Sequence, residues 1–120
     1  MKLSKIKELL DATVYAGEDI MDMEIEEACG SDLMSDVLAY VKEQALLLTG
    51  LQNLQVLRTA EMMDIEAVLF VRGKVPSDEI IEFAKSRGIA LLTTELPMFV
   101  SCGLLYENGL HGRKAGVKLG

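Results

Sequence analysis

Three short apolar segments recur along the chain at nearly even spacing, and each ends in small or polar residues. They span residues 45–50 (ALLLTG), 67–73 (AVLFVRG) and 90–94 (ALLTT), and a helix-like stretch separates each from the next. Short segments that are apolar throughout are typical of strands buried on both faces, as in parallel sheets with helical crossovers. The sequence therefore predicts an α/β fold, a three-layer α/β/α sandwich with a mostly parallel central sheet and right-handed crossovers.

Length and charge narrow the class of protein. The chain has 120 residues, which is enough for one domain with a single core, and its net charge is −7. That charge argues against binding to nucleic acid or to an anionic membrane surface, because both need clustered Lys and Arg. No apolar stretch approaches the ~20 residues that span a bilayer, and the start lacks the apolar centre of a signal peptide. We expect a soluble cytoplasmic protein.

The segments between the apolar runs predict helices. Ser77 precedes Asp78 and Glu79, and Gly88 follows the last turn, so this helix has the most complete start and stop signals. Ser4 and Asn53 are expected to cap two other helices. The expected helices span residues 4–10, 31–42, 53–63, 77–87 and 96–107, residues 13–16 (TVYA) lie between the first helix and a turn at Gly17, and residues 24–26 alternate weakly like an edge strand.

The end of the chain differs from the rest. The pattern stops after Leu110, and residues 111–120 (HGRKAGVKLG) are basic and rich in Gly, so we expect a domain over residues 1–110 followed by a loose tail. Cys29 and Cys102 are far apart in sequence and are expected to be reduced packing residues. With one His in the chain, His111, a zinc site is poorly supplied with ligands.

The candidate site lies where the predicted strands end, because parallel sheets place their ligands beyond the carboxyl ends of the strands. Arg72, Gly73 and Lys74 place two cations at one strand end, and this is the best ligand-facing candidate, with a plain surface turn as the alternative. The remaining candidates would supply backbone or side-chain donors to an anion: Thr49, Gly50, Asn53, Thr93 and Thr94.

Catalytic and cofactor motifs are missing from the sequence. It contains no Walker loop, Rossmann glycine fingerprint, Ser-His-Asp set or Cys-His dyad, so we predict no catalytic residue, no metal site and no cofactor. Asp32 and Asp36 stand four residues apart on one predicted helix. They are interpreted as a first-turn acid that stabilises the helix dipole and a solvated neighbour, with cation binding as the less favoured alternative. Ser31 is interpreted as a helix cap.

Several segments, in order, resemble the DRTGG-domain family, and the resemblance covers roughly residues 1–110. They are residues 30–38 (GSDLMSDVL), 48–51 (LTGL), 56–62 (VLRTAEM), 68–74 (VLFVRGK) and 102–106 (CGLLY). The resemblance implies an α/β/α fold similar to the N-terminal domain of HPr kinase/phosphorylase, and a regulatory or dimerising role. Members occur fused to CBS domains in nucleotide-regulated pyrophosphatases, and small stand-alone members also exist.

The chain departs from the name-giving motif of that family. Gly30 is followed by Ser31 and Asp32 where the family has an Asp-Arg pair, and the later element reads Thr49-Gly50-Leu51 instead of Thr-Gly-Gly. An Arg is well suited to binding phosphate, whereas Asp32 places an acid at this point.

Two functional hypotheses follow. The first is a non-catalytic regulatory domain that binds a small phosphorylated ligand, in particular an adenine nucleotide, at the strand ends. The alternative is a protein–protein module that docks a redox or kinase-type partner without a ligand. A homodimer fits both, since a second copy would help to enclose a ligand. The methionines proposed for an adaptable docking surface are Met21, Met23, Met34, Met62, Met63 and Met98, although most are expected in the core.

Overall fold

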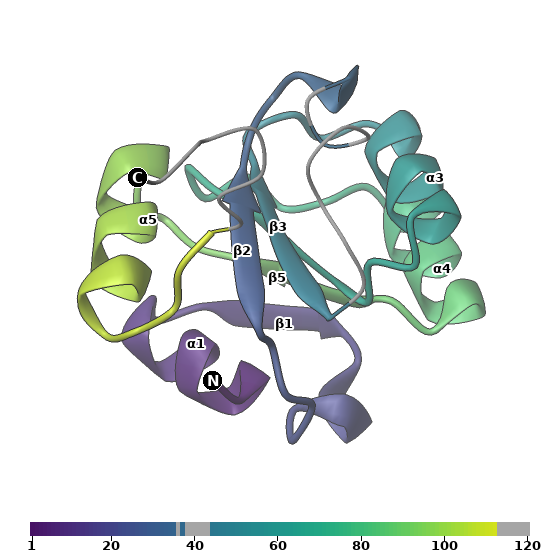
Figure 1. Ribbon diagram of the computed structural model, residues 1–120. Helices are drawn as coiled ribbons and strands as arrows, with labels where there is room; N and C mark the ends of the chain where they lie inside the picture. The colour runs from purple at the N-terminus through teal and green to yellow at the C-terminus, as the bar shows by residue number, and fades with distance from the viewer. Residues whose placement is uncertain (36, 38–43, 113–120) are drawn as a thin grey trace.

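The computed structural model describes residues 1–35, 37 and 44–112 and shows a five-stranded sheet between two layers of helices (Figure 1). The strands are β1 (Thr13–Ala16), β2 (Glu27–Gly30), β3 (Ala45–Thr49), β4 (Ala67–Phe70) and β5 (Ala90–Thr93). Their order in the sheet is β1-β5-β4-β3-β2. β2 to β5 are mutually parallel, and β1 joins β5 as an antiparallel edge strand. The predicted three-layer α/β/α sandwich is thus confirmed.

The helices are divided between the two faces of the sheet, as Figure 1 shows. α3 (Leu54–Met62) and α4 (Asp78–Arg87) lie on one side, and α1 (Leu3–Leu9) and α5 (Met98–Glu107) lie on the other. Successive strand residues alternate between the two cores: Leu47 and Val68 pack toward α3 and α4, whereas Leu46 and Leu69 pack toward α1 and α5. This alternation explains why the central strands are apolar throughout.

The strand register places the carboxyl ends of the three central strands side by side. Thr49 pairs with Phe70, and Phe70 pairs with Thr93. The predicted common edge therefore exists, and the segments that follow β3, β4 and β5 all leave the sheet there.

Local signals account for the starts of α3 and α4 and for the end of α4. The Asn53 side chain accepts a hydrogen bond from the Val56 N–H at 3.1 Å, and the Ser77 hydroxyl accepts one from the Ile80 N–H at 3.3 Å. Gly88 ends α4 with φ +68°. These caps satisfy backbone donors that the first helical turn leaves without partners.

Three local predictions are wrong. The edge strand is Glu27–Gly30 instead of residues 24–26, and Ile25 is fully buried ahead of it. Ser4 does not cap α1, whose N-cap is Lys2. Asp32 is not a first-turn helical residue, because its carboxylate bonds to the Thr49-Gly50 turn and the described helical residues begin at Met34.

Two predictions fall partly outside the described residues. The helix expected over 31–42 includes residues 36 and 38–43, Asp36 among them, and the tail includes residues 113–120. The beginning of the tail is held in place: His111 stacks on Tyr106 with ring centroids 4.2 Å apart, and its carbonyl accepts a hydrogen bond from the Ala28 N–H. Among the helices of the described ranges, none combines the length and apolar character that a membrane-spanning segment needs.

Candidate functional site

The strand-end edge carries two separate cavities, and the predicted site residues are divided between them. One cavity, of about 450 Å³, is lined by residues 30–32, Gly50, residues 71–72 and residues 97–99. The other, of about 490 Å³, is lined by residues 9–13, Tyr15, Gly73, Val75 and residues 93–96. We call them the Arg72 cavity and the Thr93 cavity.

Arg72 supplies the positive charge of the first cavity. It has φ +70°, a left-handed conformation that costs a non-Gly residue roughly 1–2 kcal/mol. The turn that imposes this conformation follows β4 directly, where the Arg72 N–H bonds to the Leu96 carbonyl and the Gly73 N–H bonds to the Thr94 carbonyl. These backbone hydrogen bonds therefore fix the point beyond β4 from which the Arg72 side chain projects.

The guanidinium of Arg72 lies over Gly50. A Cβ atom built on Gly50 would stand only 2.2 Å from the Arg72 Nη2 atom, so the missing side chain of Gly50 makes room for the cation. Within the part of the chain that the structure describes, no carboxylate forms an ion pair with Arg72. Arg72 is also exposed, so its charge is available to an anion from solvent.

The N-terminal turn of α5 also lines the Arg72 cavity. Its N-cap residue is Pro97. The proline side chain cannot accept a hydrogen bond from the N–H groups of the first helical turn, and Pro97 has no backbone N–H. Backbone donors at the start of a helix and the positive end of its dipole both favour an anion. A guanidinium and a helix start therefore flank the same 450 Å³ space.

Asp32 occupies the turn that the sequence suggested for an external anion. Its Oδ1 atom accepts hydrogen bonds from the Thr49 hydroxyl at 2.9 Å and from the Gly50 N–H at 2.7 Å. The Thr49 hydroxyl in turn accepts a bond from the Leu51 N–H at 3.1 Å. The chain thus supplies its own carboxylate to this turn and joins the ends of β2 and β3.

The Thr93 cavity has the wrong charge for an anion. Asp11 and Glu95 line it, and its described lining includes neither Lys nor Arg. Thr94 is buried, and its hydroxyl donates to the Leu10 carbonyl at 2.7 Å. Thr93 is buried as well. The Thr94 hydrogen bond ties the end of β5 to the end of α1.

Asn53 and Lys74 line neither of the two cavities. The amide side chain of Asn53 is engaged in capping α3, and the Lys74 carbonyl accepts a hydrogen bond from the Gln52 side chain at 2.9 Å. Of the eight predicted residues, Gly50 and Arg72 are the pair that the Arg72 cavity brings together. The residues that sequence reasoning missed are Pro97, Met98 and Phe99, whose only signal was the proline at the predicted helix start.

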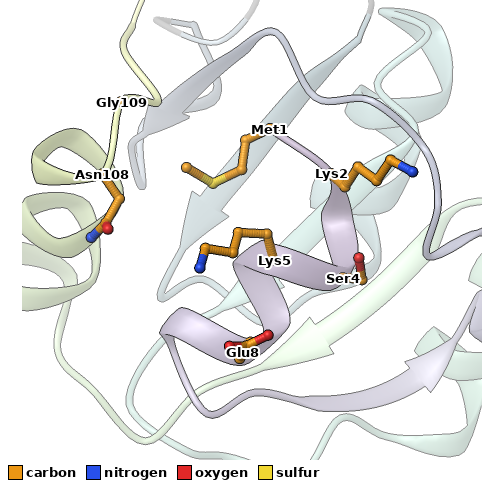
Figure 2. Close-up of a pocket in the computed structure, with 7 residues that line it drawn as sticks. All are labelled: Met1, Lys2, Ser4, Lys5, Glu8, Asn108 and Gly109. Atoms are coloured by element: carbon orange, nitrogen blue, oxygen red, sulfur yellow. The ribbon is translucent and has the colours of Figure 1, made fainter.

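A third cavity, of about 480 Å³, lies between α1 and the end of α5. Figure 2 shows that Met1, Lys5 and Asn108 surround it, while the Lys2 side chain points away from Lys5 and Asn108. The Lys2 and Lys5 ammonium groups do not converge on one point (Figure 2). Within the described residues, no group of three or more His, Cys, Asp or Glu side chains lies close enough together to hold a metal ion.

The sulfur-containing residues are mostly packing residues. Cys29 and Cys102 pack against opposite faces of the sheet, and burial raises the pKa of the Cys102 thiol. Of the six methionines proposed for a docking surface, Met62 alone is exposed, with 64% of its surface accessible. The other five are partly buried and are divided between the two core clusters. They do not form a continuous surface.

Comparison with known proteins gives a structural similarity. No protein-family profile and no curated protein sequence matches the chain. Among solved structures, the chain is similar to the CBS and DRTGG domains of the regulatory region of Clostridium perfringens pyrophosphatase, in complex with its activator, diadenosine tetraphosphate. The TM-score is 0.73 at 20% identity, and the match covers 87% of this chain and 45% of that chain. The two proteins share a fold, and this chain matches less than half the length of that regulatory region.

Proposed function

We propose that the chain is a DRTGG-type regulatory domain without catalytic activity, which binds a small phosphorylated ligand at the strand ends and acts as a homodimer. The ligand we favour is an adenine nucleotide. Two independent lines support this proposal: the sequence resemblance, and a shared fold with a regulatory region whose activator is diadenosine tetraphosphate.

The observation that carries the proposal is the environment of Arg72. It is an exposed cation in a left-handed backbone conformation that lines a 450 Å³ cavity together with the start of α5, and no carboxylate of the described residues pairs with it. Binding sites for small molecules typically enclose about 300–1,000 Å³, so the cavity can take a nucleotide phosphate and part of its sugar. We assign the phosphate to the Arg72 guanidinium and the first N–H groups of α5.

The departure from the DRTGG motif is consistent with this assignment. Asp32 fills the Thr49-Gly50 turn from within the chain, so that turn has no free donor for a phosphate. The cation comes instead from the end of β4. In this member we therefore place the ligand on the Arg72 side of the turn.

A thermal-shift titration with AMP, ADP, ATP and diadenosine tetraphosphate tests the proposal. A ligand at 100 times its dissociation constant stabilises the folded state by about 2.7 kcal/mol. We expect at least one of these nucleotides to raise the melting temperature of the wild-type protein. Arg72→Asn should abolish the shift, and Asn tolerates the left-handed backbone, so the unliganded melting temperature should change little.

Two further variants sharpen this test. Arg58→Gln is the matched control, because Arg58 is an exposed arginine on α3, away from the cavity, and it should keep the full shift. Lys74→Gln tests whether Lys74, the second cation beyond β4, contributes to nucleotide binding. Flat melting curves across the panel would refute ligand binding, and an undiminished shift in Arg72→Asn would show that the site lies elsewhere.

One observation favours the alternative, a protein–protein module that docks a redox or kinase-type partner. α5 presents exposed apolar residues to solvent, with Phe99 88% and Tyr106 58% exposed. Large exposed apolar side chains that lie close together mark interaction surfaces. Flat nucleotide titrations together with a stoichiometric partner recovered through α5 would favour this alternative.

A further inference from the structure

α5 is apolar around its whole circumference. Glu107 is its only charged residue, and most of the others are Met, Phe, Val, Cys, Leu or Tyr. A helix of this composition is typically buried on all sides. In this fold, however, only Ser101 and Leu105 of α5 are buried, and Phe99, Val100 and Tyr106 are 88%, 41% and 58% exposed.

Gly103 lies in the middle of the same exposed face, and nothing in the described part of the chain requires a glycine there. Among the described residues, a Cβ atom on Gly103 would meet nothing within 4 Å. Glycine inside a helix costs about 1 kcal/mol relative to alanine. Phe99 and Val100 precede Gly103 by four and three residues, and Tyr106 and Glu107 follow it by three and four, so all five lie on one face. The missing side chain of Gly103 therefore leaves a gap on this face between the larger side chains of Val100 and Tyr106.

This spacing is symmetric about Gly103, which matches a twofold contact. If two copies of α5 pack antiparallel with the axis at Gly103, Val100 meets the partner's Tyr106 and Phe99 meets the partner's Glu107. The two glycines then face each other and let the helices approach closely. In such a contact one surface patch must complement itself, and this pattern does so.

Charge favours the same arrangement. The chain carries a net charge of −7, so two copies repel each other wherever acids are exposed. The α5 face has a single charge, and the antiparallel arrangement places each Glu107 opposite the start of the partner's α5, where Pro97 leaves the backbone donors without a side-chain cap. A carboxylate near the positive end of a helix is stabilising.

We propose that the outer face of α5 is the homodimer interface, with the twofold axis at Gly103. This inference rests on the dimerising role proposed above and names the surface that performs it. Phe99 also lines the Arg72 cavity, so the second copy would cover its mouth. One helix face is smaller than the roughly 800 Å² per partner of a standard interface, so we expect a reversible dimer of micromolar affinity.

Sedimentation velocity over the micromolar concentration range tests the interface. The wild-type protein should shift from monomer to dimer as its concentration rises. Gly103→Gln fills the gap between the two α5 helices and should abolish the dimer. Its monomer should unfold at an equal or higher urea concentration, because a Cβ atom at this position meets none of the described residues and glutamine favours a helix. Met62→Ser is the matched control: Met62 is as exposed as Tyr106 but lies on the opposite helical layer, so this variant should dimerise like the wild type.

Cross-linking tests the geometry. In a Cys29→Ala, Cys102→Ala background, Gly103→Cys should form a covalent dimer on mild oxidation, because the axis brings the two introduced thiols together. A wild-type protein that stays monomeric, or a Gly103→Gln variant that dimerises normally, would overturn the inference. A monomer that still shows the Arg72-dependent nucleotide shift would overturn the interface alone and leave the proposed ligand binding intact.

Discussion

Removing the Asp32 carboxylate should separate the ends of β2 and β3. Its Oδ1 atom accepts two hydrogen bonds, from the Thr49 hydroxyl at 2.9 Å and the Gly50 N–H at 2.7 Å. A hydrogen bond to a charged group contributes about 1.5–3 kcal/mol. Because Asp32 is exposed, solvent screens this contribution, and we expect Asp32→Ala to lower the free energy of unfolding by about 2 kcal/mol in total.

Urea denaturation followed by circular dichroism measures this loss. Asp32→Asn keeps an acceptor oxygen without the charge and should lose about half as much. Asp22→Ala is the matched control, since Asp22 is an exposed acid with no hydrogen bond or ion pair to any described residue, and it should stay within about 0.5 kcal/mol of the wild type. An Asp32→Ala variant as stable as this control would refute the reasoning.

A double-mutant cycle with Thr49→Val isolates the side-chain bond. The two residues share a hydrogen bond, so their effects should not be additive, and we expect a coupling free energy of about 1 kcal/mol. Additive losses would mean that Asp32 acts through the Gly50 N–H alone.

Three further changes have distinct expected outcomes. Gly50→Ala places a methyl group where the Arg72 guanidinium lies, so the affinity for nucleotide should fall by about tenfold or more. The melting temperature of the unliganded protein should stay nearly constant, since only the tip of a flexible side chain must move. An affinity at the wild-type level would contradict this. Ser101→Ala should raise the free energy of unfolding, measured by urea denaturation, by about 1 kcal/mol, because the buried hydroxyl has no hydrogen-bond partner among the described residues. A lower free energy of unfolding would contradict this and would mean that the hydroxyl has a partner. Burial raises the pKa of the Cys102 thiol, so its alkylation, followed by mass spectrometry, should reach half-maximal rate at a higher pH in the folded protein than in urea; coinciding pH profiles would contradict that shift.

The fold was readable from the sequence because its central strands are buried on both faces. Ala45–Thr49, Ala67–Phe70 and Ala90–Thr93 are short and apolar apart from a final Thr in two of them, which is typical of interior strands. The edge strands were harder. Glu27–Gly30 includes an acid and a glycine, and Thr13–Ala16 has only four residues and no clear alternation, so neither shows a distinctive pattern.

The site was predictable to the level of the sheet edge and no further. Consecutive strands with parallel direction brought Gly50 and Arg72 to one rim, as expected. The separation of this rim into two cavities depends on α5 crossing to the β2 side of the sheet, and on Asp32 reaching the Thr49-Gly50 turn. Both depend on contacts between segments far apart in the chain, which periodicity and capping signals do not encode.

The most direct test of a strand-end ligand site is a ¹H–¹⁵N correlation spectrum recorded during titration with diadenosine tetraphosphate or AMP. We expect the amide signals of Ser31, Gly50, Arg72 and Phe99 to move together with a single dissociation constant, because these residues line one cavity. Signals that move instead around Thr93 and Glu95, or a spectrum that does not change at saturating nucleotide, would contradict the account.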